Sequence, residues 1–187
     1  RENDKAVELL EKALSLNPND VDTLIVYAQG LAITGEDEQA IQSAYEAMQI
    51  DPLNPDVHDA LATVLSRVGQ DEKAVEVLEQ GLTSWPRNLE LLTSLRRIHF
   101  FASDYASALK VSETITEMDP ENFGNWQARF EMYLDLGALT EAQEAVNRMY
   151  ELAPERAYDE MAKMELAKGL VDGYREYLRK YTEARSW

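Results

Sequence analysis

The stretch "EKALSLNPND", residues 11–20, ends an apolar-periodic run with a proline. That proline opens a series in which each member lies 34 residues after the previous one: Pro18, Pro52, Pro86, Pro120 and Pro154. The sixth proline, Pro55, stands outside the series. A constant interval of this length predicts a repeat protein built from two-helix units.

Other residues share the interval. Alanine recurs in the same register, twelve residues before each proline of the series, at Ala6, Ala40, Ala74, Ala108 and Ala142. Small residues form a third register at Gly35, Gly69, Ser103 and Gly137. Apolar residues inside each unit follow helical spacing, as at Ala40, Ile41, Ala44, Ala47 and Met48. The sequence therefore predicts an all-α fold of repeated helix, turn and helix.

Each shared position has a physical role. The proline ends a helix because it lacks an N–H and disfavours helix in the residue before it. The Gly or Ser permits a tight turn between the two helices, and the alanine is small enough for two helices to cross closely. Asp20, Asn54, Asn88 and Asn122 precede the next helical pattern and are the expected N-caps.

These shared positions resemble the tetratricopeptide repeat family. In the unit from Val21, the family's characteristic positions hold Leu24, Tyr27, Ala28, Leu31, Ala40, Ala44, Ala47 and Pro52. The unit from Leu89 is looser, because Arg96 takes a position that is usually small. The resemblance implies a right-handed α-solenoid of helix hairpins with a C-terminal capping helix.

We divide residues 1–187, taken as a single domain, by this register. The predicted parts are a partial repeat holding only a second helix (1–20), four repeats (21–54, 55–88, 89–122 and 123–156), and a degenerate repeat with the capping helix (157–187).

The two ends of the stack carry separate expectations. At the start, a lone second helix leaves an apolar face that either upstream residues or another chain must cover. At the end, Tyr174, Tyr177, Leu178 and Tyr181 share one helical face with charged residues elsewhere, as a cap requires. The chain begins with Arg1, so we interpret it as a mature or excised segment.

The net charge and the composition argue against several kinds of binding partner. The formal net charge is −17, from 18 Lys+Arg and 35 Asp+Glu, which opposes binding to nucleic acid or to an anionic membrane surface. The chain contains no cysteine and no apolar stretch near the roughly 20 residues of a membrane-spanning helix, so we expect no direct membrane insertion. We expect a soluble segment of the cytoplasm or the bacterial periplasm, and leave the compartment open.

Catalytic chemistry is not indicated. The only histidines, His58 and His99, occupy positions that normally pack between helices, so we assign them structural roles. No metal-ligand motif, nucleophile elbow or Gly-rich phosphate loop is present. We therefore predict a protein that is not an enzyme, with no cofactor and no metal.

The resemblance places a peptide-binding groove on the first helix of each unit. The residues that it assigns to this groove are Asp22, Ile25, Val26, Gln29, Asp56, Asp59, Thr63, Arg67, Glu90, Thr93, Arg97, Phe101, Gln127 and Glu131. The basic residues with which some family members clamp an acidic chaperone tail are absent from these positions. Carboxylates stand there instead, so a neutral or basic segment is favoured, with an apolar anchor near Ile25, Val26 and Phe101.

Arg96 and Arg97 are unusual in this acidic chain. Three interpretations stay open: loosened packing between units, pairing with Asp or Glu across the hairpin, or a local basic spot that receives a partner's carboxylate.

The leading hypothesis is a non-catalytic scaffold, an adaptor or assembly factor that recruits a protein or peptide into its groove. One alternative is the substrate- or partner-recognition arm of a larger enzyme such as a glycosyltransferase. Another is a self-association module, a homodimer formed through exposed terminal helices.

Overall fold

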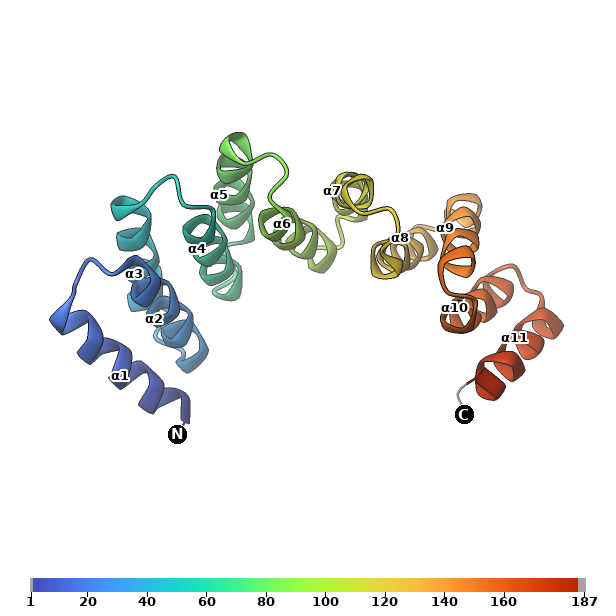
Figure 1. The fold of residues 1–187 in the computed structure, drawn as a ribbon, viewed down its shortest axis with the longest axis horizontal. Helices are drawn as coiled ribbons and strands as arrows, with labels where there is room; N and C mark the ends of the chain where they lie inside the picture. Colours follow the sequence, from blue (N-terminus) through green and yellow to red (C-terminus); the bar gives the residue numbers. More distant parts are fainter. Residues whose placement is uncertain (1, 185–187) are drawn as a thin grey trace. The chain divides into compact units, whose positions relative to one another are not determined.

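The computed structural model describes residues 2–184, except for the side chains of seven residues in the last helix, and these residues form eleven α-helices (Figure 1). The helices are α1 (Glu2–Leu16), α2 (Val21–Thr34), α3 (Asp37–Ile50), α4 (Pro55–Arg67), α5 (Asp71–Ser84), α6 (Leu89–Phe101), α7 (Tyr105–Met118), α8 (Phe123–Asp135), α9 (Leu139–Leu152), α10 (Pro154–Ala167) and α11 (Val171–Ala184). No β-strand occurs within residues 2–184, which confirms the predicted all-α fold.

The helices fall into two compact units. Unit 1 is Arg1–Asp104, with α1 to α6, and unit 2 is Tyr105–Trp187, with α7 to α11. In unit 1 each helix packs on the next, and α4 also packs on both α2 and α6. In unit 2 successive helices pack likewise, and α8 also contacts α10. This pattern of nearest and second-nearest neighbours is that of a helical solenoid.

The boundary between the units lies between α6 and α7, inside the segment predicted as the third repeat. The assignment of residues 1–187 to a single domain, and its division into repeats, stays a prediction.

The four predicted N-caps are confirmed. Asp20 accepts a hydrogen bond from the Thr23 N–H at 3.4 Å, and Asn54, Asn88 and Asn122 each accept one from a first-turn N–H at 3.0 Å. Each bond satisfies a backbone donor that the helix leaves unpaired.

The turns within the hairpins follow the third register. Gly35, Gly69 and Gly137 have φ values of 89°, 80° and 69°, and Ser103 has 59°. Glycine adopts this left-handed region without steric cost, whereas serine there is strained.

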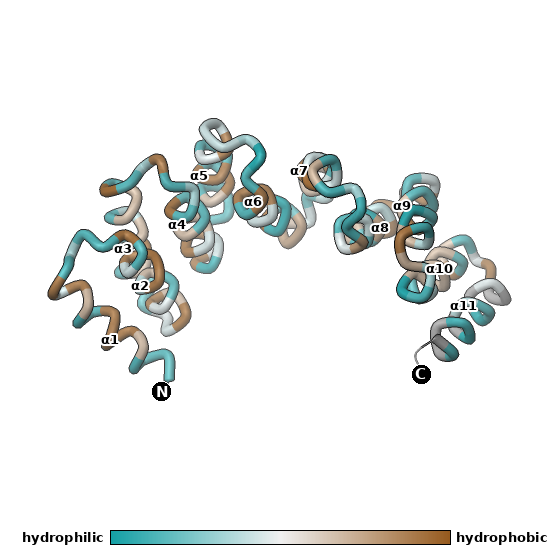
Figure 2. Tube along the Cα trace, viewed as in Figure 1, coloured by the Kyte–Doolittle hydropathy of each residue, from teal (hydrophilic) through white to brown (hydrophobic). Residues whose placement is uncertain are grey.

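The periodic alanines are buried, with one exception. Ala40, Ala74, Ala108 and Ala142 are each 0% exposed, as expected where helices approach closely. Figure 2 shows hydrophobic and hydrophilic residues alternating along the helices, as one-sided burial requires. Ala6 is exposed, contrary to its place in the series. It lies on α1, which contacts only α2 among the described helices, so no hairpin partner covers it.

The prolines of the series also differ in one respect. Pro52, Pro86 and Pro120 lie in the exposed turns between repeats, whereas Pro154 is the first residue of α10. Proline is tolerated there because the first N–H of a helix has no intrahelical partner.

The last helix, α11, packs on α10. Its Tyr177 ring stacks on the Tyr158 ring with centroids 6.4 Å apart, and Arg175, Glu176 and Arg179 are exposed. The side chains of Tyr174, Leu178 and Tyr181, also assigned to the inner face, lie outside the described part of the chain.

One tight contact shows how side-chain volumes are matched between helices. Gly81 of α5 is buried, and a Cβ added to it would lie 3.0 Å from the His58 ring and 3.0 Å from a Leu91 methyl. His58 cannot move freely, because it is 4% exposed and its Nδ1 is hydrogen-bonded to the Asn54 carbonyl at 3.1 Å. Gly81 thus makes room for a bulky His58.

We expect Gly81→Ala to destabilise the protein by roughly 1 kcal/mol, since overpacking outweighs the better helix propensity of alanine. Chemical denaturation measures this. In His58→Ala the ring is gone, so adding Gly81→Ala to that variant should cost less than in wild type. Equal costs in the two backgrounds would contradict the contact.

A candidate peptide-binding face on the first helices

The structure distributes the predicted groove residues over both units. Twelve of the fourteen lie in unit 1, on α2, α4 and α6, while Gln127 and Glu131 lie on α8 of unit 2. Short loops connect successive helices, so neighbours run antiparallel and α2, α4 and α6 point the same way. Unit 1 therefore presents three parallel helices, which we call the first-helix face.

Carboxylates gather at the N-terminal ends of this face. Asp22, Asp56 and Glu90 are exposed residues in the first turns of α2, α4 and α6. The positive end of each helix dipole stabilises them there. Asp59, one turn further along α4, is half-buried, and its Oδ1 has no hydrogen-bond partner among the described residues. Because α2, α4 and α6 are neighbours, these residues form an acidic row.

A pocket of about 190 Å³ lies toward the other end of the same face. We call it the α4–α6 pocket; its lining residues are Thr63, Ser66, Arg67, Arg97, Ile98 and Phe101. Thr63, Arg67, Arg97 and Phe101 belong to the predicted groove set, so the structure brings these four together.

Hydrogen bonds fix the polar walls of the α4–α6 pocket. Arg67 donates from Nε to the Ala32 carbonyl of α2 at 3.1 Å, and Arg97 donates to the Thr63 hydroxyl at 3.4 Å. Ser66 donates to Asp71 at 2.6 Å. The two arginines thus tie α2 to α4 and α4 to α6.

The predicted apolar anchors differ in exposure. Phe101 is 78% exposed and meets the Phe100 ring edge-on, and Val26 is 50% exposed. Ile25 is partly buried against the cluster formed by Leu24, Ala47 and Val57. Phe101 and Val26 are therefore available to a ligand, while Ile25 contributes mainly to the core.

Arg96 differs from its neighbour Arg97. Its guanidinium is half-buried, one nitrogen is enclosed without a hydrogen-bond partner among the described residues, and burial lowers its pKa. Arg97 is exposed, so it is the arginine of this pair that a partner can reach.

In unit 2 the structure connects Gln127 to a residue that sequence reasoning missed. The Gln127 amide donates to Glu160 of α10 at 2.7 Å. Glu160 is 4% exposed, and its other oxygen has no partner among the described residues. Burial raises the pKa of this carboxyl, against the lowering effects of a backbone hydrogen bond and of Lys163. The sequence could have indicated this residue. Glu160 follows Trp126 by one repeat of 34 residues and therefore occupies a position that usually holds a bulky side chain.

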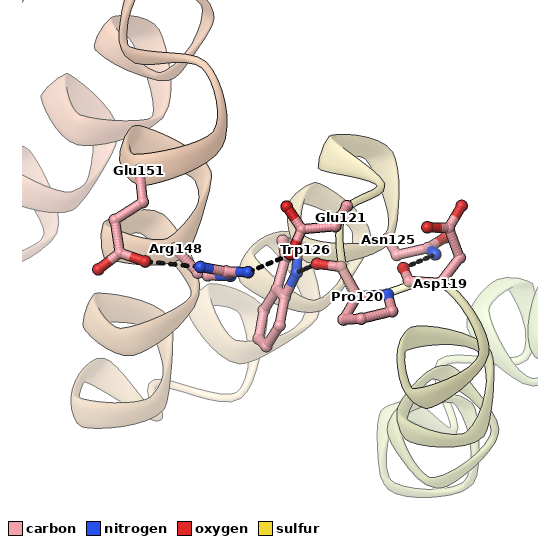
Figure 3. Close-up of polar contacts among 7 residues, drawn as sticks. All are labelled: Asp119, Pro120, Glu121, Asn125, Trp126, Arg148 and Glu151. Atoms are coloured by element: carbon pink, nitrogen blue, oxygen red, sulfur yellow. Dashed lines mark hydrogen bonds and ion pairs between the residues drawn. The ribbon is translucent and has the colours of Figure 1, made fainter.

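Polar contacts join the loop between α7 and α8 to α8 and to α9 around Trp126 (Figure 3). Arg148 pairs with Glu121 at 2.6 Å and with Glu151 at 2.8 Å, and the Trp126 indole donates to the Pro120 carbonyl at 2.8 Å. These contacts hold the loop before α8 in place.

Beside this loop is a pocket of about 350 Å³, lined by Glu113, Thr116, Glu117, Pro120, Trp126 and Arg129. The basic residue of this pocket, Arg129, already has partners within unit 2. Its guanidinium lies over the Trp126 ring at 5.0 Å, donates to the Tyr133 hydroxyl at 2.9 Å and lies 3.9 Å from Glu113. We therefore assign Arg129 to the packing of unit 2.

The two histidines have local structural partners. His58 is buried against Asn54, as described above, and His99 lies 3.3 Å from the Asp104 carboxylate. Within the described residues, no group of three or more His, Asp or Glu side chains is arranged to hold a metal ion. Nor does any described helix have the length and apolar character needed to cross a membrane.

Comparison with known proteins agrees with this architecture. Solved structures that share the fold include the MamA protein, with 19% identity, a TM-score of 0.71, and coverage of 88% of this chain and 91% of that chain. MamA 41-end from Desulfovibrio magneticus RS-1 has 19% identity and a TM-score of 0.72, with coverage of 88% and 94%. At this identity the likeness concerns the fold alone. No curated protein matches the chain.

Two family models match the sequence. A tetratricopeptide repeat model matches residues 1–20, and with the periodic positions and the helix packing it identifies the chain as a tetratricopeptide-type helical repeat protein. A second model, ChAPs (Chs5p-Arf1p-binding proteins), matches residues 51–165. Since this match spans more than half of the sequence, the chain belongs to the ChAPs family.

Glu160 yields a pH-dependent prediction. Its pKa is raised in the folded state, so its charge costs stability increasingly as the pH rises from the ordinary value through the folded value. Glu160→Gln should therefore stabilise the protein more at pH 8, where the buried carboxyl is charged, than at pH 5. Urea denaturation at both pH values measures the difference; an equal or larger gain at pH 5 would contradict the raised pKa.

Proposed function

We propose that this protein is a non-catalytic scaffold that binds a segment of another protein on the first-helix face of unit 1. The observation that carries the proposal is the convergence of exposed groove residues there: the acidic row at one end, and the α4–α6 pocket at the other. The ChAPs family is named for binding Chs5p and Arf1p, which supports a protein as the partner.

The charge of this face favours a neutral or basic segment. Asp22, Asp56 and Glu90 are exposed and none forms an ion pair within the described residues, so a partner's Lys or Arg can approach them at little desolvation cost. The formal net charge of −17 adds long-range attraction for a basic segment and repulsion for nucleic acid. Exposed Phe101 and Val26 offer apolar contact on the same face.

The acidic row can be tested by neutralisation. Peptides selected on the wild-type protein from a phage-displayed random library should be neutral or basic. We expect Asp22→Asn, Asp56→Asn and Glu90→Gln together to weaken the tightest selected peptide about threefold or more at physiological salt, because each exposed pair contributes about 0.2–1 kcal/mol. Calorimetry measures the affinity.

A matched control lies on the second helices of unit 1. Asp37→Asn, Glu38→Gln and Glu72→Gln remove the same charge from first turns of α3 and α5, with a comparable loss of dipole stabilisation. This control should bind like wild type. Selection of acidic peptides, or equal weakening by the two triple variants, would contradict the proposal.

Self-association is a second candidate because of one observation on α1. Ala6, Leu9, Ala13 and Leu16 form an apolar stripe at helical spacing, and all four are exposed, Leu9 by 66% and Leu16 by 87%. A second copy of the chain would cover this stripe.

If α1 mediates self-association, the sedimentation coefficient of the wild type should rise with protein concentration at physiological salt, and that of Leu9→Glu with Leu16→Glu should not. Leu53→Glu, at a site 69% exposed in the turn before α4, is the control and should behave like wild type. A wild type that stays monomeric at every concentration would rule this function out.

A further inference from the structure

We propose that the α4–α6 pocket binds an Asp or Glu side chain of the partner segment, together with an apolar side chain next to it in that segment. The proposal rests on the proposed function and names the anchor that the first-helix face recognises. The segment it describes is neutral or basic overall and carries one carboxylate beside an apolar residue.

The first argument is the unbalanced charge of the pocket. Arg67 and Arg97 are both exposed, and neither forms an ion pair within the described residues. The chain has 35 acidic and 18 basic residues, so two neighbouring arginines without acidic partners are unexpected. Among the described residues, Asp71 is the carboxylate that accepts a hydrogen bond from a pocket residue, Ser66, and it forms no ion pair with either arginine.

The second argument is that both guanidinium groups have a hydrogen-bond partner on a neighbouring helix and further donors that are unused among the described residues. Arg67 uses its Nε–H on the Ala32 carbonyl, which leaves both terminal amino groups unused. Arg97 uses one terminal amino group on Thr63, which leaves the other and Nε unused. A guanidinium group with unused donors suits a carboxylate, which accepts two parallel hydrogen bonds from it. Prior positioning also lowers the entropy cost of binding.

The third argument concerns the size and apolar part of the pocket. Ile98 is buried and Phe101 is 78% exposed, so an apolar side chain could cover Phe101 against Ile98. The volume of about 190 Å³ is below the roughly 300 Å³ at which pockets for small-molecule ligands begin. It suits side chains of a peptide better than a free metabolite.

The acidic row makes an extended anionic surface a poor occupant. Asp56 and Arg67 are separated by eleven residues of α4, about 16 Å along the helix. Asp59, the nearer carboxylate of the row, precedes Arg67 by eight residues or about 12 Å. A single carboxylate bound by Arg67 therefore stays beyond the Debye length of about 8 Å from both Asp56 and Asp59. Nucleic acid or an anionic membrane would meet the row as well as the arginines.

The experiment uses defined peptides and the full chain. The probe is the N-acetylated, C-amidated pentapeptide Lys-Ala-Glu-Leu-Ala, which has no net charge, and the matched probe has Gln in place of Glu. A third probe is the Gln peptide with a free C-terminal carboxylate. NMR spectra of ¹⁵N-arginine-labelled protein report binding through the Nε–H signals of Arg67 and Arg97, assigned from the variants.

The Glu peptide should shift both signals saturably and bind about tenfold or more tightly than the Gln peptide. Arg67→Gln and Arg97→Gln should each abolish this preference for Glu. Arg97→Lys should retain only part of it, because the lysine ammonium lacks the two parallel donors of a guanidinium group. Arg87→Gln, at an exposed arginine in the turn before α6, should leave it intact.

Equal binding of the Glu and Gln peptides would overturn the proposal. So would binding of the free-acid peptide as tight as that of the Glu peptide, since the ligand would then be a chain terminus. If selected peptides still depend on the acidic row while the Glu peptide leaves both signals unchanged, the carboxylate anchor is refuted and the scaffold function stands.

Discussion

The stack depends on close approach of helices at positions where side-chain volume is restricted. Ala40 and Ala74 in unit 1, and Ala108 and Ala142 in unit 2, are completely buried, and interiors at native packing density have no room for larger groups there. The pair His58 and Gly81 shows that the restriction applies to the summed volume. Where one helix carries a larger group, its neighbour loses its Cβ.

This volume restriction does not apply to the outer faces of the helices, where charged residues are accommodated. The helix dipoles influence where those charges lie. Acidic side chains are stabilised at the N-terminal ends of α2, α4 and α6 by the helix dipoles. At the opposite end of α2, Arg67 donates to the Ala32 carbonyl, a group that complements a cation. The separation of sign along the first-helix face thus follows from helix electrostatics, and any recognition built on it costs the fold little.

Sequence reasoning succeeded where the determinant is local. The four N-caps, the turns with positive φ and the helix periodicity each depend on a few adjacent residues, so they could be predicted position by position. The exposure of Ala6 departs from its register but agrees with the prediction that the lone helix at the start has an uncovered apolar face. Glu160 was missed because its partner, Gln127, comes from a different repeat. The α4–α6 pocket was predicted in part. The repeat register assigned four of its six lining residues to the groove, but only the folded chain shows which hydrogen bonds Arg67 and Arg97 form.

The proposed carboxylate anchor would also let an acidic repeat protein discriminate among basic partners. A uniformly negative face attracts every basic segment and sets no register, because exposed charge pairs are weak and tolerate displacement. A cationic pocket at one end repels a segment that places Lys or Arg there and accepts one that places a carboxylate there. Specificity needs such a repulsive element as well as an attractive one. The separated charges of α4 and α6 would therefore set both the direction and the register of the bound segment, which a net charge of −17 alone cannot do.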